Sequence, residues 1–199
     1  VNSQDINQAS LFFQKSLNTW MEKYEPREYF AQKMQKSSYQ EIPEANKEAF
    51  QKAFNLAETE MEKSAAENYL DFRPHLFLGE LYIGSYRLSG DQEKIVKAEQ
   101  VLEKAVQLSP TNQQGYWNLA EVRLGQGKIE ETINLLKKAV DLEPRLAHSH
   151  WYLAMAYSIA GQNQLAKDEA TKAGELGYKW RDTIENLKRV IDIYLALND

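Results

Sequence analysis

The sequence predicts an all-α protein built from stacked helix-turn-helix units. Apolar residues recur at helical spacing through most of the 199 residues, and no segment shows the alternation that is typical of a strand. The second observation is a repeat: 34 residues separate Trp117 from Trp151, and the same step joins Gly127 to Gly161. Other pairs one period apart are Leu119 and Leu153, Ala120 and Ala154, Lys104 and Lys138, Ala105 and Ala139, Leu108 and Leu142, and Pro110 and Pro144. Such a period predicts a solenoid of helical repeats.

The composition, with 43% hydrophobic and 27% charged residues, is ordinary for a helical protein. A net charge of −5 argues against a nucleic-acid partner, which would favour a clustered basic face. No apolar run approaches the roughly 20 residues that cross a bilayer, so we expect no membrane contact by these residues. The absence of cysteine excludes disulfides, thiolate nucleophiles and cysteine–zinc sites. The start at Val1, without methionine or a signal peptide, fits an excised domain.

Three helices are expected in the N-terminal third of the chain: Gln4 to Tyr24, Pro26 to Met34, and Glu44 to Glu67. The apolar stripe of the first helix comprises Ile6, Ala9, either Phe12 or Phe13, Leu17 and Trp20. The buried face of the third comprises Ala49, Phe50, Ala53, Phe54, Ala57 and Met61. Because this part lacks the 34-residue pattern, we interpret residues 1–67 as degenerate repeats or as a helical cap over the open end of the stack.

The repeats are expected in residues 68–179. The first unit has a helix from Pro74 to about Leu88, then Asp91 as the N-cap of a helix that ends near Leu108. This unit is about seven residues longer than the regular one. We expect the extra residues to lengthen both helices by about a turn each or to enlarge the loop.

From Asn112 onward the repeat is regular. Four helices are predicted, at 113–125, 129–142, 147–160 and 164–176, and turns are predicted at Gly90, Gly127 and Gly161. Gly177 would stop the last repeat helix in the left-handed conformation that ends many helices. The segment 180–199 has apolar residues on one face and charges opposite, so we interpret it as a capping helix.

The order of features within each unit resembles the tetratricopeptide repeat. Tryptophan comes early, glycine stands in the middle, alanine follows in the second half and proline ends the unit, as in Trp117, Gly127, Ala139 and Pro144. The resemblance implies a right-handed superhelical solenoid, with an N-terminal helical region and a C-terminal capping helix. It also implies that the first helix of each repeat lines a concave groove that binds a protein or peptide partner.

The resemblance assigns a set of groove positions. They are Gln114, Trp117, Asn118 and Glu121 in the regular repeat, His148, Trp151, Tyr152 and Met155 in the next, and Arg73, Leu76, Phe77 and Glu80 in the looser preceding unit. Tryptophan and tyrosine are frequent anchors of interfaces and platforms for sugars. Trp117 and Trp151 therefore either bind a ligand or fill the space between neighbouring helices.

Chemical function within these residues is not indicated. His148 and His150 are two apart on a helix and would point in different directions, so no metal site is predicted, and neither a catalytic residue nor a cofactor is expected. Glu58, Glu60 and Glu62 are expected to be solvated. The carboxylate-clamp variety of this repeat has lysine where Trp117 and Trp151 stand, so recognition of a chaperone tail is not expected.

A second resemblance concerns three phrases, at 108–117, 147–154 and 175–178. They look like the C-terminal repeat tail of bacterial O-antigen ligase or polymerase-like membrane proteins. This would place the domain on the extracytoplasmic face of a bacterial membrane, holding a partner of the envelope-glycan machinery or the glycan itself. Three hypotheses follow: a protein-interaction scaffold, a carbohydrate-binding module that uses Trp117 and Trp151, and, far behind, an enzyme.

Overall fold

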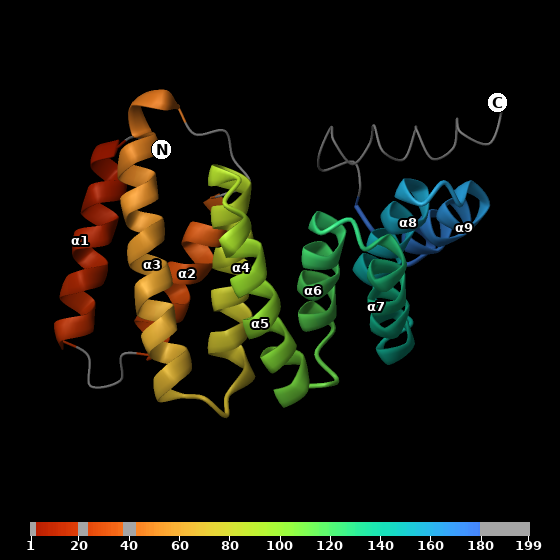
Figure 1. Ribbon diagram of the computed structural model, residues 1–199, viewed down its shortest axis with the longest axis horizontal. Helices are drawn as coiled ribbons and strands as arrows, with labels where there is room; N and C mark the ends of the chain where they lie inside the picture. Colours follow the sequence, from red (N-terminus) through yellow and green to blue (C-terminus); the bar gives the residue numbers. More distant parts are fainter. Residues whose placement is uncertain (1–2, 20–23, 38–42, 180–199) are drawn as a thin grey trace. The chain divides into compact units, whose positions relative to one another are not determined.

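The computed structural model describes residues 3–19, 24–37 and 43–179 (Figure 1). Within these ranges every regular element is helical, which confirms the predicted all-α class. The helices are α1 (Ser3–Thr19), α2 (Tyr24–Ser37), the short 3-10 helix η1 (Glu44–Asn46), α3 (Lys47–Glu67), α4 (Phe72–Ser89), α5 (Gln92–Leu108), α6 (Gln113–Gly125), α7 (Ile129–Leu142), α8 (Ala147–Ile159) and α9 (Asn163–Glu175). The predicted capping helix in 180–199 lies outside the described residues.

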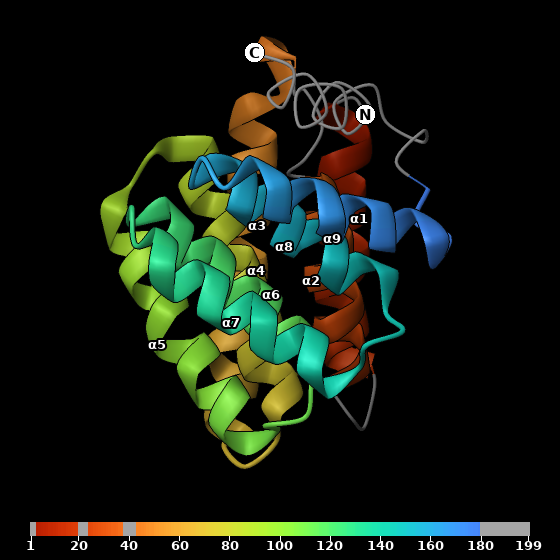
Figure 2. The ribbon, with the colours of Figure 1, turned by 90° about the vertical axis from the view of Figure 1, so that its right-hand side faces the viewer.

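The helices form two compact units, residues 1–110 and residues 111–199. In each unit, consecutive helices pair: α4 lies against α5, α6 against α7, and α8 against α9 (Figure 2). The predicted boundary between residues 67 and 68 coincides with the turn between α3 and α4, inside the first unit.

In the first unit, α3 packs against α1, α2 and α4. The predicted face of α3 is buried, with Phe54 and Met61 at 0% exposure, and only Ala49 of that set is half-exposed. On α1, Ile6 and Phe13 are buried whereas Ala9 of the predicted stripe is exposed, and Phe13 stacks on Phe30 of α2 with ring centroids 4.2 Å apart. Phe12 is 71% exposed, so the choice that the apolar stripe left open is settled in favour of Phe13.

The longer repeat unit places its extra residues in its helices. Helices α4 and α5 have 18 and 17 residues, whereas α6 and α7 have 13 and 14. The turn between α4 and α5 stays short, and Asp91 accepts a hydrogen bond from the Glu93 amide at 2.9 Å as the predicted N-cap. A Cβ at Gly79 would lie 2.4 Å from Cγ of the buried Leu102. Gly79 therefore marks the close contact between these two helices.

The predicted turns at Gly90, Gly127 and Gly161 are confirmed. All three have positive φ, between 70° and 75°, a backbone conformation that residues other than glycine rarely adopt. Gly177 has φ of 85° directly after the turn that ends α9, as the sequence predicted. The bounds of α6 and α7 also agree with the predicted 113–125 and 129–142.

Two of the three acidic residues of α3 that were expected to be solvated are buried, which corrects the sequence-based expectation for Glu58 and Glu60. Glu58 and Glu60 are only 4% and 7% exposed, while Glu62 lies at the surface. Glu60 accepts a hydrogen bond from the buried Arg27 of α2, and Glu58 pairs with Lys94 of α5 at 2.5 Å. The hydroxyl of Tyr82 on α4 donates to Glu62 at 2.6 Å; burial and then this bond raise the pKa of Tyr82 well above its usual range. These carboxylates tie α3 to its neighbours.

The repeat register is tested by Ala139, which is 0% exposed on α7. Leucine at this position would add methylenes to a filled contact, so we expect Ala139→Leu to lower the free energy of unfolding by about 1–3 kcal/mol. Urea unfolding would measure the change, with Ala66→Leu on the exposed surface of α3 as the matched control. An unfolding midpoint that moves no more for Ala139→Leu than for the control would show that the register is wrong.

Candidate interaction surface

The second unit carries a row of five aromatic rings, which we call the aromatic row. Trp117 comes from α6, whereas His148, Trp151 and Tyr152 come from α8, where spacings of three and four residues place them on neighbouring turns. The fifth ring, Tyr178, follows the turn that ends α9. Helices α6 and α8 are the first helices of two successive repeats, and four of the five rings stand at positions that the sequence analysis assigned to the groove; Tyr178 was not among them.

The rings contact one another in a defined order. Trp117 lies 5.4 Å from Tyr152 in an edge-to-face arrangement and 6.2 Å from His148. His148 meets Tyr178 edge to face at 5.0 Å, and Tyr178 stacks on Trp151 at 5.4 Å with 24° between the planes. These separations are the ones at which aromatic pairs attract one another. The row is therefore held together by its own ring contacts.

The two tryptophans differ in exposure although they occupy the same position of the repeat. Trp151 is 1% exposed and belongs to the core of the second unit, with Tyr178 packed against it. Trp117 is half-buried, and its indole N–H donates to the buried Ser149 hydroxyl at 3.1 Å. In this conformation a ligand reaches Trp117 but does not reach Trp151.

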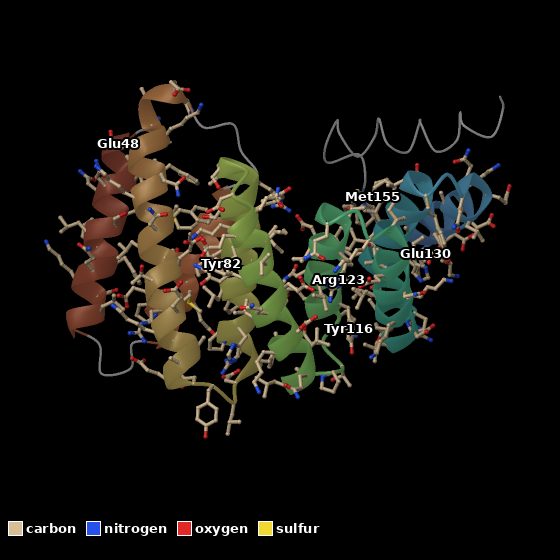
Figure 3. The ribbon with its side chains drawn as sticks, viewed as in Figure 1. Glu48, Tyr82, Tyr116, Arg123, Glu130 and Met155 are labelled. Atoms are coloured by element: carbon tan, nitrogen blue, oxygen red, sulfur yellow. The ribbon has the colours of Figure 1, made fainter. Side chains whose placement is uncertain are left out.

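The remaining predicted groove residues of this unit lie along α6 and α8. His148 and Gln114 are exposed, and Asn118, Glu121, Tyr152 and Met155 are half-buried. Figure 3 marks Met155 on α8 and Arg123 on α6. Arg123 is engaged with Glu131 of α7 at 3.2 Å. The accessible part of the aromatic row is thus formed by Trp117, His148, Tyr152 and Tyr178, with Met155 one turn further along α8.

The groove positions predicted in the first unit belong to α4 and its N-terminus. Phe77 is half-buried on α4, and Glu80 is only 6% exposed. Leu76 is buried as well, while Arg73 is exposed and pairs with Asp71, the N-cap of α4, at 2.7 Å. Glu80 and Leu76 therefore contribute to packing within the first unit.

His150 is a buried residue whose role sequence reasoning missed. It is 6% exposed, and its Nε2 donates to the Pro144 carbonyl at 2.9 Å. Its Nδ1 lies 2.6 Å from the Glu169 carboxylate of α9, within hydrogen-bond distance. His150 thus ties α8 to α9 and to the preceding turn, because the hydrogen bonds of a buried polar group hold its partners in place. The sequence feature related to this role is Glu169, which lies 19 residues from His150, and the helical pattern alone does not predict that the two meet.

Neither a metal cluster nor a membrane span is found within 3–19, 24–37 and 43–179. No group of three or more His, Asp or Glu side chains there is arranged to hold a metal ion. None of the helices in the same ranges is long and apolar enough to cross a membrane.

Comparison with known proteins gives the fold. A family model of the tetratricopeptide repeat matches residues 91–156, the segment that includes both tryptophans of the aromatic row. The crystal structure of TTC0263, a thermophilic TPR protein in Thermus thermophilus, is similar over 97% of this chain and 99% of that one, with a TM-score of 0.64 and 21% identity. The chain has the tetratricopeptide repeat fold.

Other solved structures agree. A crystal structure of MamA is similar over 90% of this chain and 93% of that one, with a TM-score of 0.61 and 16% identity. A MamA RS-1 double mutant gives a TM-score of 0.60 at 20% identity, over 87% and 89% of the two chains. No curated protein matches the chain. Proteins with tetratricopeptide repeats are generally non-catalytic scaffolds for protein–protein interaction.

Proposed function

We propose that this chain is a scaffold that binds a protein or peptide partner on the first helices of its two regular repeats, α6 and α8. The observation that carries the proposal is a set of accessible rings on α6 and α8, namely half-buried Trp117 and Tyr152 beside exposed His148. Large aromatic side chains supply most of the binding free energy in many protein interfaces. Half-buried rings also lose little conformational freedom when a partner covers them.

The polar residues beside the rings fit a peptide. Gln114, Asn118 and Glu121 run along α6, next to Trp117. The amides can donate and accept hydrogen bonds along an extended backbone and the carboxylate can accept them, while the rings contact the side chains of the peptide. Position 117 has tryptophan where the carboxylate clamp has lysine, so a free peptide C-terminus has no matching cation here.

The second resemblance suggests which partner. If the chain is the soluble tail of an O-antigen ligase-like membrane protein, the partner belongs to the envelope-glycan machinery and the domain works on the extracytoplasmic face. This part of the proposal rests on the sequence phrases at 108–117, 147–154 and 175–178. Identification of the bound protein by mass spectrometry tests it directly, because a partner from another process would exclude it.

A glycan is the alternative ligand of the same surface. Sugar stacking would use the faces of Trp117 and Trp151, but Trp151 is 1% exposed under Tyr178. A two-tryptophan platform for a sugar therefore requires displacement of Tyr178, whereas a protein partner can already contact the accessible rings of Trp117, His148 and Tyr152. Soluble envelope-glycan fragments would be titrated in parallel, and saturable binding that quenches tryptophan fluorescence would favour the carbohydrate module.

The binding surface is tested by Tyr152→Ala. We expect this change to weaken partner binding by about 2 kcal/mol, roughly thirtyfold, because a truncated interface anchor has an effect of this size. The melting temperature should change little, since Tyr152 is half-buried. The control is Leu165→Ala on α9, which removes a side chain that is 46% exposed and is not a member of the aromatic row.

The partner protein would first be captured with the wild-type chain and identified by mass spectrometry. Its affinity would then be measured by titration with the wild-type chain and with each variant. Equal affinity of the wild-type chain and Tyr152→Ala, with the fold intact, would exclude this surface. Equal weakening by both variants would show that the effect is not specific to the aromatic row.

A further inference from the structure

Tyr178 covers Trp151 from a position outside any helix. The chain turns back at Gly177, and the Tyr178 amide donates to the Ala173 carbonyl at 2.9 Å. This turn carries the half-buried Tyr178 ring onto the side of α8 where Trp151 and His148 lie.

The contacts of the Tyr178 ring are those of a bound aromatic group. Its face stacks on the Trp151 indole at 5.4 Å, and His148 meets it edge to face at 5.0 Å. Stacked and edge-to-face neighbours together fix both the depth and the tilt of a planar ring. Trp151 and His148 thus form a seat for one ring, which we call the ring seat.

The preceding repeat shows how the same position is covered elsewhere. One period earlier, Trp117 is approached by His148 and Tyr152, which are fixed in helix α8. Among the described residues, the ring that stacks on Trp151 is that of Tyr178, which follows a left-handed glycine beyond the end of α9. A ring held in this way is exchanged at a smaller conformational cost than one held by a packed helix.

We propose that the ring seat receives an aromatic side chain of the partner, and that Tyr178 occupies it in the free protein. Tyr178 is then an intramolecular competitor, which leaves the seat when a tyrosine or phenylalanine of the partner enters. This inference rests on the proposed binding function and specifies its chemistry. It predicts a partner segment that presents an exposed aromatic residue, since the seat consists of two rings and holds one ring in the free protein.

The ring seat can be tested without the partner by adding p-cresol, a small molecule with the structure of the tyrosine side chain. In Tyr178→Ala of the full chain the seat is vacated, so p-cresol should shift the indole N–H resonance of Trp151 saturably and raise the melting temperature. In the wild-type chain, the affinity for p-cresol should be lower by about tenfold or more, because p-cresol must displace Tyr178. Tyr29→Ala, which removes an exposed tyrosine of α2, controls for non-specific binding of the phenol.

Absence of a saturable shift in Tyr178→Ala would overturn the proposal, and so would an equal shift in the wild-type chain. Tyr178→Val repeats the test with a smaller apolar cover if the alanine variant does not fold. With the captured partner, Tyr178→Ala should bind about tenfold more tightly than the wild-type chain, whereas weaker binding would make Tyr178 part of the contact surface and overturn the competition. Failure of the proposed function would show separately, as unchanged partner affinity in Tyr152→Ala.

Discussion

Replacing Trp151 with alanine is expected to lower the free energy of unfolding by about 3–5 kcal/mol. Trp151 is 1% exposed and lies in the core of the second unit with Leu153, Ala154 and Ala170. Truncation of so large a buried side chain removes its contacts and leaves a cavity that the helices fill only in part. Urea unfolding followed by far-ultraviolet circular dichroism would measure the loss, with Tyr152→Ala as the half-buried control from the same helix.

This measurement decides between the two interpretations of Trp151 that the repeat pattern allows. A core residue reduces stability when truncated, whereas a groove residue reduces partner binding with little effect on the unfolding midpoint. An unchanged midpoint for Trp151→Ala would show that this side chain is exposed in solution and would contradict the packing described above.

Arg27→Ala is expected to destabilise the first unit by about 3 kcal/mol. The Arg27 side chain of α2 is 4% exposed and donates to Glu60 at 3.1 Å and to Glu67 at 2.5 Å, both on α3. Removing one member of a buried ion pair leaves the other without its partner, which is strongly destabilising. The effect should lie at the lower end of the usual range, because Lys63 still pairs with Glu60. Lys52→Ala, which breaks an exposed pair on α3, is the control and should leave the unfolding midpoint almost unchanged.

The ion pair between Arg27 and Glu60 also predicts how the free energy of unfolding changes with pH. Burial raises the pKa of Glu60, but the hydrogen bonds and charges of Lys63 and Arg27 outweigh it and hold the pKa below its ordinary value of 4.5. A carboxyl group with a lowered pKa in the folded state stabilises the protein above pH 4.5, and this contribution is lost as the pH falls through the lowered value. The difference in stability between the wild-type chain and Arg27→Ala should therefore shrink in acid. A difference that grows below pH 4.5 would contradict the assignment.

The helices of the regular repeats were predictable because their determinants are local or periodic. The glycines at 127 and 161 mark turns that need positive φ, and the spacing of apolar residues between them predicts α7 and α8. The extra length of the preceding unit was predictable in the same way, but the sequence left open whether it lengthens the helices or the loop; the structure places it in α4 and α5.

The environments of individual residues were harder to predict, because they depend on distant parts of the chain. Trp117 and Trp151 occupy equivalent repeat positions, yet Tyr178, 27 residues after Trp151, covers only the latter. Glu58 and Glu60 looked like surface residues, but Lys94 and Arg27, 36 and 33 residues away, are their partners. A helical pattern specifies which side of a helix is apolar but does not identify the charged residues of other helices that meet it.

The central claim, that the α6–α8 surface binds a protein partner, is tested most directly by site-specific photo-crosslinking. A benzoylphenylalanine would replace Met155, half-buried on α8, and in a second protein it would replace Leu165, exposed on α9. We predict a crosslinked partner from position 155 and none from position 165. Excess unlabelled wild-type chain should abolish the crosslink, and the same excess of Tyr152→Ala should not. Crosslinks of equal yield from both positions, or equal competition by the two unlabelled chains, would contradict the account.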